Sequence, residues 1–220
     1  MPGTATRVIL ASGSPQRSEI LQKLGIEFEV LVPGVEELSG GDPEAEVIEN
    51  ARRKAWAVAV SRAGGAVGGP TPEEALATAG GGGSPAATGH ARGGVMIIAC
   101  DTDVVLDGRA LGKPADAAEA RSYLDRMSGR AHVVMSGLVV LEGGEERGGL
   151  EKTTVVFKHL NEAEKRRYVE FGEWRGRSGG YAIQTLGSTL VERLEGSVSN
   201  VVGLPVGLLA ELAPRLLARD

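Results

Sequence analysis

The chain has 220 residues, of which 42% are hydrophobic and 24% charged, and these are ordinary values for a soluble globular protein. Its net charge of −5 gives no broad attraction to nucleic acid or to an anionic membrane, so we expect neither partner. The single cysteine, Cys100, excludes an internal disulfide and a cysteine-based zinc site. The sequence has no signal-peptide pattern and no run of about 18 apolar residues, and we expect a cytoplasmic protein.

The first quarter of the chain predicts two strands and two helices in alternation. Residues 7–11 are typical of a short strand. A helix is predicted from Pro15, with Ser14 as its N-cap. The alternating segment 26–32 predicts a second strand, and the second helix begins after Asp42.

Residues 62–94 differ sharply in composition from the rest of the chain. Eleven of these 33 residues are glycine. Such a segment buries too little apolar surface to offset its chain entropy. We therefore predict a single domain, 1–220, that carries a flexible glycine-rich insertion at 62–94.

The segment 96–114 places acidic groups behind a run of apolar residues. Residues 95–99 predict a buried strand with Asp101 at its end, and 106–109 predict a hairpin because Asp-Gly favours a tight turn. Strand alternation would place Asp103 on the same side as Asp101. Position alone leaves two roles for Asp101, a functional carboxylate or the cap of a turn. The histidines lie in the insertion or beside predicted strands, which leaves carboxylates as the available general bases.

The second half predicts a pair of long antiparallel strands between helices. A helix covers 116–127, a strand follows at 132–141, and a turn at 142–149 leads to a partner strand at 152–157. The further predicted elements are a helix capped by Asn161, short strands at 181–184 and 188–193, and a helix from Pro205. This irregular mixture of strands and helices favours an α/β or mixed α+β fold.

Short motifs along almost the whole chain resemble those of the Maf family of nucleoside triphosphate pyrophosphatases, in the same order. Only the glycine-rich insertion falls outside the resemblance. The resemblance implies a curved mixed sheet flanked by helices, with two lobes around a cleft, similar to the fold of inosine triphosphate pyrophosphatases. It also implies a homodimer. The motifs are 11–17 (ASGSPQR), 19–25 (EILQKLG), 35–37 (VEE), 51–55 (ARRKA), 101–102 (DT), 111–114 (LGKP), 128–132 (SGRAH), 179–184 (GGYAIQ) and 199–205 (SNVVGLP).

The family resemblance implies hydrolysis of a nucleoside triphosphate to the monophosphate and pyrophosphate with a divalent cation, Mg²⁺ or Mn²⁺. Water attack on the α-phosphorus needs a base, a metal ion and cations on the leaving group. By resemblance Asp101 is the proton acceptor, and Glu37 is a metal ligand together with Asp101. The residues expected to hold the phosphates are Arg17, Lys54 and Lys113, with Ser12 and Ser14 at the start of the first helix.

Three positions in the family track the preferred base. Members that act on dTTP and UTP carry Arg, Thr and Gln there, and this chain carries Gln16, Thr102 and Gln184. Glutamine offers a neutral amide that both donates and accepts, whereas arginine only donates. Two matches of three favour a pyrimidine nucleotide such as dTTP or UTP.

Two alternatives stay open at this point. One is a nucleotide-binding regulator of cell division that does not hydrolyse its ligand. The other is a purine-specific pyrophosphatase of the inosine triphosphate type. The combination of a candidate base with several lysines favours hydrolysis, because a protein that only binds has little need for a base.

Overall fold

The computed structural model describes residues 6–62 and 94–218, which contain strands and helices in mixed order. The strands are β1 (Arg7–Leu10), β2 (Phe28–Val30), β3 (Val95–Leu106), β4 (Arg109–Ala110), β5 (Ala131–Glu142), β6 (Glu145–Phe157) and β7 (Val191–Glu195). The helices are α1 (Pro15–Lys23), α2 (Pro43–Arg62), α4 (Ala117–Met127), α5 (Glu162–Phe171), α6 (Val198–Val202), α7 (Val206–Leu212) and α8 (Pro214–Leu217), with 3-10 turns η1 (Ser178–Gly180) and η2 (Leu186–Leu190).

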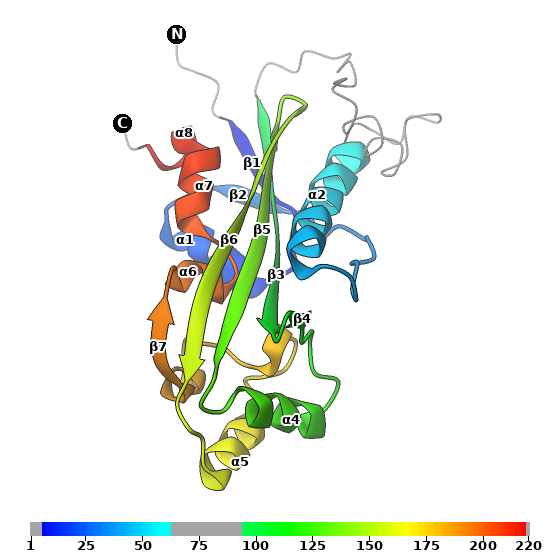
Figure 1. Cartoon of the computed structure of the whole chain (residues 1–220). Helices are drawn as coiled ribbons and strands as arrows, with labels where there is room; N and C mark the ends of the chain where they lie inside the picture. The colour runs from blue at the N-terminus through cyan, green and yellow to red at the C-terminus, as the bar shows by residue number, and fades with distance from the viewer. Residues whose placement is uncertain (1–5, 63–93, 219–220) are drawn as a thin grey trace.

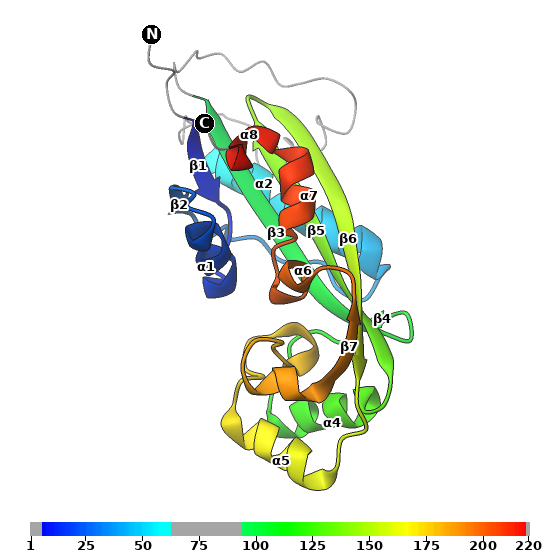
Figure 2. The ribbon, with the colours of Figure 1, turned by 90° about the vertical axis from the view of Figure 1, so that its left-hand side faces the viewer.

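The strands in this part of the chain form one seven-stranded sheet in the order β2-β1-β3-β5-β6-β7, with β4 paired to β3. The long strands β3, β5 and β6 are antiparallel and run along most of the molecule, with α4 and α5 beyond one end of them, as Figure 1 shows. β1 and β2 join them in parallel at one end, and β4 and β7 join them at the other. α2 covers one face of the long strands, while α6 and α7 lie on the opposite face (Figure 2). The predicted mixed α/β fold is confirmed.

The sheet divides the core into two layers. Alternate residues of a strand point to opposite faces. Ile97 therefore joins the apolar cluster formed with α2, whereas Ile98 joins the cluster formed with α1 and α7. The same alternation directs Asp101 to the α2 side and Thr102 to the opposite side.

β3 changes its neighbour halfway along, and this creates an open edge. On one side it pairs with β1 through residues 95–98 and with β4 through 105–106, and residues 99–104 have no strand partner there among the described residues. On the other side β5 pairs with all of this stretch. The prediction that the strand ends at residue 99 is therefore wrong, because β5 supports it past Asp101 and Asp103.

Capping residues predicted most helix starts correctly. Most of the wrong element bounds belong to strands, whose lengths depend on their pairing partners. Asp116 caps α4 by accepting from the backbone N–H of Glu119 at 2.8 Å, and Asn161 forms a capping box at α5. The predicted strand at 26–32 is shorter because β2 pairs only with the four-residue β1.

The turn between the long strands is also shorter than predicted. Gly143 and Gly144 have φ of 62° and 87°, and they make a tight turn that lets β6 begin at Glu145. Residues 181–184 form no strand, and β7 begins at Val191 after a 3-10 turn. α7 begins at Val206, one residue after the predicted start at Pro205, and the short α6 precedes it.

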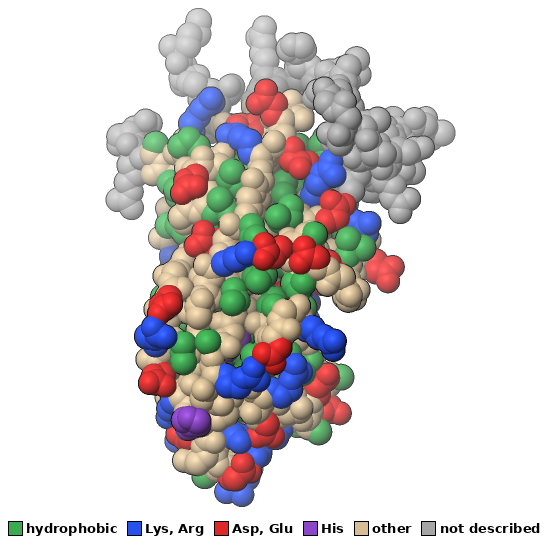
Figure 3. Space-filling model, viewed as in Figure 1, with side chains coloured by type: hydrophobic (Ala, Val, Ile, Leu, Met, Phe, Trp, Pro, Cys, Tyr) green, Lys and Arg blue, Asp and Glu red, His purple; other side chains and the backbone are tan. Residues whose placement is uncertain are grey.

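The predicted insertion at 62–94 lies outside the described residues except for its two ends. The assignment of 1–220 to a single domain stays a prediction. Within residues 6–62 and 94–218, no helix combines the length and apolar character needed to cross a membrane. On the face in Figure 3, acidic and basic side chains are interspersed.

Candidate active site

A cleft of about 630 Å³ lies beside the open edge of β3, which is a size suited to a nucleotide-sized ligand. Its walls come from the loop after β1, the loop before α2, α2 itself, β3 and the segment around η1. All ten residues that the sequence singled out line it, although their roles stay predictions. These residues are Ser12, Ser14, Gln16, Arg17, Glu37, Lys54, Asp101, Thr102, Lys113 and Gln184.

Asp101 is held through both of its carboxylate oxygens. Its side chain is buried, and Lys54 places Nζ 2.6 Å from Oδ1. Asn50 donates through Nδ2 to Oδ2 at 3.0 Å. Asn50 and Lys54 lie one turn apart on α2, so a single helix face supplies both partners. A carboxylate offers about four acceptor sites, so acceptor capacity remains for a proton from water.

Asn50 also fixes the loop that carries Glu37. Its Oδ1 accepts from the backbone N–H of Leu38 at 2.7 Å, and its Nδ2 donates to the Leu38 carbonyl at 3.1 Å. The loop thereby brings Glu37 Oε1 within 2.6 Å of Lys54 Nζ. Asn50 was missed in the sequence, where its spacing of four residues before Lys54 was the available signal.

Glu37 and Asp101 converge on one cation. Each places an oxygen 2.6 Å from the Lys54 ammonium. Lys113 is more loosely held, with Nζ 3.9 Å from Glu37 Oε2 and 60% of its side chain exposed. Among the residues the structure describes, no group of three or more His, Cys, Asp or Glu side chains is arranged to hold a metal ion. Two carboxylates do fit Mg²⁺, which usually takes one or two from the protein and the rest from phosphates and water.

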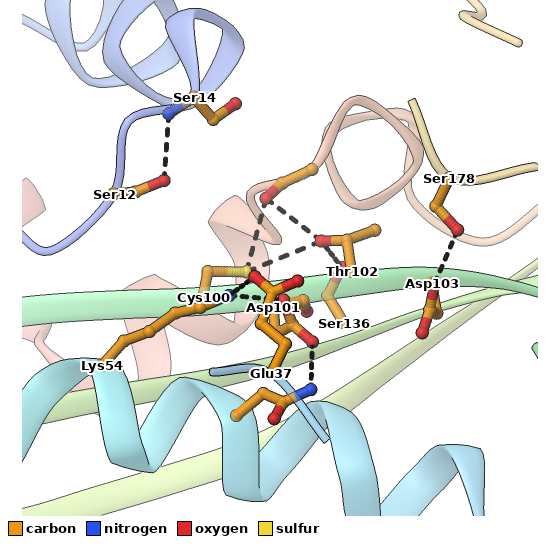
Figure 4. A network of polar contacts seen from close by, with 12 residues as sticks. Ser12, Ser14, Glu37, Lys54, Cys100, Asp101, Thr102, Asp103, Ser136 and Ser178 are labelled. Carbon is orange, nitrogen blue, oxygen red and sulfur yellow. Dashed lines mark hydrogen bonds and ion pairs between the residues drawn. The ribbon is translucent and has the colours of Figure 1, made fainter. Parts of the chain in front are cut away.

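Asp103 connects β3 to the segment around η1 instead of joining the Glu37–Asp101 pair. Ser178 donates to Asp103 Oδ1 at 2.6 Å and accepts from the backbone N–H of Val104 at 3.1 Å (Figure 4). Burial raises the pKa of Asp103 to about 6; the Ser178 hydrogen bond opposes this rise, and the carboxylates of Asp101 and Glu37 add to it. The contact fixes the segment around η1 against the open edge.

Arg17 of α1 lies on the face of β3 opposite α2. Its Nε donates to the Gly203 carbonyl at 2.8 Å, and its terminal nitrogens donate to Ser12 Oγ and Thr102 Oγ1, each at 3.1 Å. Thr102 also shares a 2.8 Å hydrogen bond with Ser136, its cross-strand partner on β5. Every partner named here is uncharged, so the guanidinium keeps its charge available for an anion.

Ser14 lies at the N-cap position of α1 but makes no side-chain cap, contrary to the prediction. Its hydroxyl instead accepts from the amide nitrogen of Gln16 at 3.0 Å, with the amide oriented to satisfy its neighbours. In that orientation the Gln16 oxygen accepts from both terminal nitrogens of Arg177 at 3.2 Å. Arg177 was missed because only the fold brings it to α1. Gln184 lines the cleft with an exposed side chain.

The sequence matches the family model described as "Maf-like protein" over residues 7–216. Similar proteins named dTTP/UTP pyrophosphatase occur in Deinococcus radiodurans and Pelotomaculum thermopropionicum, each 39% identical. The alignments cover 95% and 93% of this chain, and 92% and 94% of those proteins. A protein of the same name from Pyrococcus abyssi is 35% identical over 93% of this chain and 94% of its own. The structure of the Staphylococcus aureus Ham1 protein aligns at a TM-score of 0.42 and 11% identity, over 96% of this chain and 92% of that one.

Proposed function

The chain belongs to the Maf-like protein family, and from this premise we propose that it is a nucleoside triphosphate pyrophosphatase. Its products are a nucleoside monophosphate and pyrophosphate, with pyrimidine substrates such as dTTP and UTP preferred. The names of the relatives support the activity and the base preference. The observation that carries the proposal is the buried Asp101 carboxylate, oriented by two donors in a cleft that also contains cations.

Asp101 is the general base of the proposed reaction. Water attacks the α-phosphorus, its proton passes to the Asp101 carboxylate, and the bond from that phosphorus to the bridging oxygen breaks. Pyrophosphate leaves with the bonding electron pair. Lys54 and Asn50 support this role because they fix the orientation of the carboxylate before the substrate arrives.

The cations of the cleft hold the triphosphate. Lys54 has three N–H donors and uses two for Glu37 and Asp101, which leaves one for a phosphate oxygen. Within residues 6–62 and 94–218, the hydrogen-bond partners of Arg17 are uncharged, and Lys113 is exposed enough to move toward a ligand. Ser12 and Ser14 lie at the start of α1, where backbone N–H groups favour an anion.

Glu37 and Asp101 are the residues that would hold a divalent cation, Mg²⁺ or Mn²⁺. The support is their convergence on the Lys54 ammonium. When bound, such an ion supplies charge neutralisation on the phosphates. Thr102 and Gln184 line the cleft at positions proposed to contact the base, together with Gln16.

The test is to offer the purified protein the common ribo- and deoxyribonucleoside triphosphates with Mg²⁺ or Mn²⁺ and to measure pyrophosphate. We expect the fastest release from dTTP and UTP, and loss of release in Asp101→Asn. Binding without release would instead support a regulator, and fastest release from ITP would support a purine-specific enzyme. Undiminished release in Asp101→Asn would exclude Asp101 as the base.

A further inference from the structure

Arg177 reaches across the cleft from the segment around η1 to the start of α1. It lies immediately before η1, and its terminal nitrogens meet the Gln16 amide oxygen of α1 at 3.2 Å. Its Nε donates to the Glu173 carbonyl at 2.8 Å. The next residue, Ser178, is bonded to Asp103 and to the backbone of Val104. The backbone from which the Arg177 side chain extends is therefore fixed against β3.

The guanidinium of Arg177 keeps unused donors. An arginine has five N–H donors and no acceptor. Its partners in the described part of the chain are two uncharged oxygens, the Glu173 carbonyl and the Gln16 amide. Nε has a single hydrogen, and one hydrogen on each terminal nitrogen accounts for the bonds to Gln16. Two N–H groups remain, and Arg177 lines the cleft.

The same contact determines what Gln16 offers to a ligand. Its amide oxygen is occupied by Arg177, and its nitrogen donates to Ser14. The group still free on this amide is its second N–H. Arg177 and Gln16 together thus present N–H donors to the cleft. A ligand placed against them needs acceptor oxygens.

We propose that Arg177 is a specificity-determining residue that donates to the carbonyl oxygen at position 4 of the substrate's base. This inference rests on the proposed function. Thymine carries a carbonyl oxygen at position 4, and so does uracil, whereas cytosine carries an amino group there that only donates. The N–H donors of Arg177 and Gln16 can therefore bond to thymine or uracil. With cytosine, the same donors would face the N–H groups of its amino group. The phosphates have their own cations around Asp101 and Glu37, which Arg177 does not contact.

The test compares kcat/KM for UTP, dTTP, CTP and dCTP in the wild type and in Arg177→Ala. We expect the wild type to favour UTP over CTP, and the variant to lose about 10- to 100-fold on UTP and dTTP with little change on CTP and dCTP. Arg177→Lys retains the charge without the planar pair of N–H donors. Its kcat/KM on UTP and dTTP should lie between those of the wild type and Arg177→Ala. Equal losses on all four nucleotides would show a phosphate contact and overturn the proposal, as would an unchanged UTP/CTP ratio.

Arg175→Ala is the matched control. Arg175 lies two residues away, is exposed, and stacks 4.7 Å from the Trp174 ring outside the cleft. We expect wild-type rates and an unchanged UTP/CTP ratio. A change in that ratio as large as in Arg177→Ala would contradict the proposal, because it would point to a general effect on this lobe.

Binding measurements separate this inference from the proposed function. Calorimetry with α,β-methylene analogues of UTP and CTP reports base preference without turnover. If the wild type released no pyrophosphate, the proposed activity would fail, yet an Arg177-dependent preference for the UTP analogue would still support the contact. Equal binding of both analogues by the wild type would overturn it.

Discussion

Asp101 is held by Asn50 as well as by Lys54. Lys54 pairs with one carboxylate oxygen and Asn50 donates to the other. Asn50 makes two further bonds to the backbone of Leu38, and it is almost fully buried. One amide therefore aligns the candidate base and also holds the loop that presents Glu37.

Asn50→Ala should lower kcat more than it raises KM. The variant removes the donor on Asp101 Oδ2 and both bonds to Leu38, so the base is less well oriented while most phosphate contacts remain. We expect a loss of about 10- to 100-fold in kcat in steady-state kinetics on UTP. Asn50→Asp should lose more, because it places two carboxylates face to face. Arg53→Gln, on a more exposed part of α2, is the control and should retain wild-type kcat. Wild-type kcat in Asn50→Ala would contradict this role.

His132 makes the fold sensitive to acid. Burial lowers the pKa of His132 to about 4, from an ordinary value of 6.5. Between these two values the unfolded chain binds a proton that the folded chain does not. The contribution of neutral His132 to the free energy of unfolding is therefore full above pH 6.5, the pKa in the unfolded chain. It is lost as pH falls toward about 4, the pKa in the folded protein.

Urea unfolding at two pH values tests this effect. From pH 7 to pH 5 we expect His132 to remove about 2 kcal/mol from the free energy of unfolding. His132→Gln keeps a partner for the Tyr181 hydroxyl, which bonds His132 Nε2 at 2.8 Å, but does not titrate. Between pH 7 and pH 5, the free energy of unfolding of His132→Gln should fall by about 2 kcal/mol less than that of the wild type. Equal losses in the two proteins would show that His132 is not responsible.

At the scale of elements, the approach of α2 to the sheet positions the candidate base. α2 packs directly over Gly137 of β5, the register partner of Asp101. A Cβ at Gly137 would lie 2.2 Å from the Val47 carbonyl oxygen and 2.6 Å from the Ile48 nitrogen. The absence of a side chain at this one position allows the helix to bring its polar face down to Asp101.

Gly137→Ala should therefore affect stability and activity together. The helix must move away, which separates Lys54 from Asp101. We expect about 1–3 kcal/mol of destabilisation by urea unfolding, and a fall in kcat. Gly148→Ala is a matched control on β6, where the added Cβ would meet its nearest neighbours at 3.3 and 3.4 Å. A Gly137→Ala protein with normal stability and turnover would show that α2 tolerates the shift.

Sequence signals located the elements whose determinants are local. The caps at Asp116 and Asn161 act within three residues, and both helices begin where predicted. The length of β3 depends on β5, which lies far along the chain, so the apolar run at 95–99 could not define its end. Residues 181–184 are similar: the backbone N–H of Ala182 donates to the Tyr168 hydroxyl at 3.0 Å instead of to a strand.

The residues of the candidate site also divide into those that local motifs predicted and those that depend on remote contacts. The family motifs predicted ten of the residues that line the cleft, since each motif is a short segment. Asn50 and Arg177 were missed because their roles depend on distant partners, Leu38 and Gln16. The helical spacing of Asn50 and Lys54 was a local signal, whereas no local pattern marks the contact of Arg177 with Gln16.

At the scale of the whole molecule, two lobes meet at the open edge of β3. The first lobe supplies the start of α1, the loop carrying Glu37, and α2; the second supplies the segment around η1. A nucleotide in the cleft would contact both lobes. The homodimer and the cytoplasmic location stay predictions.

Removal of divalent metal should stop turnover without unfolding the protein. The Lys54 ammonium already lies 2.6 Å from both Glu37 and Asp101, so the fold has a cation of its own at this point. We expect EDTA to abolish pyrophosphate release and added Mg²⁺ to restore it, with the same melting temperature throughout. A large fall in melting temperature on chelation would show that the fold itself needs a metal ion.

The central claim is that water, activated by Asp101, attacks the α-phosphorus of a pyrimidine nucleoside triphosphate. Hydrolysis of UTP in ¹⁸O-labelled water, followed by mass spectrometry of both products, tests it most directly. The claim predicts one ¹⁸O atom in UMP and none in pyrophosphate, with no labelled product formed by Asp101→Asn. Label in pyrophosphate, or labelled UMP formed by Asp101→Asn at the wild-type rate, would contradict it.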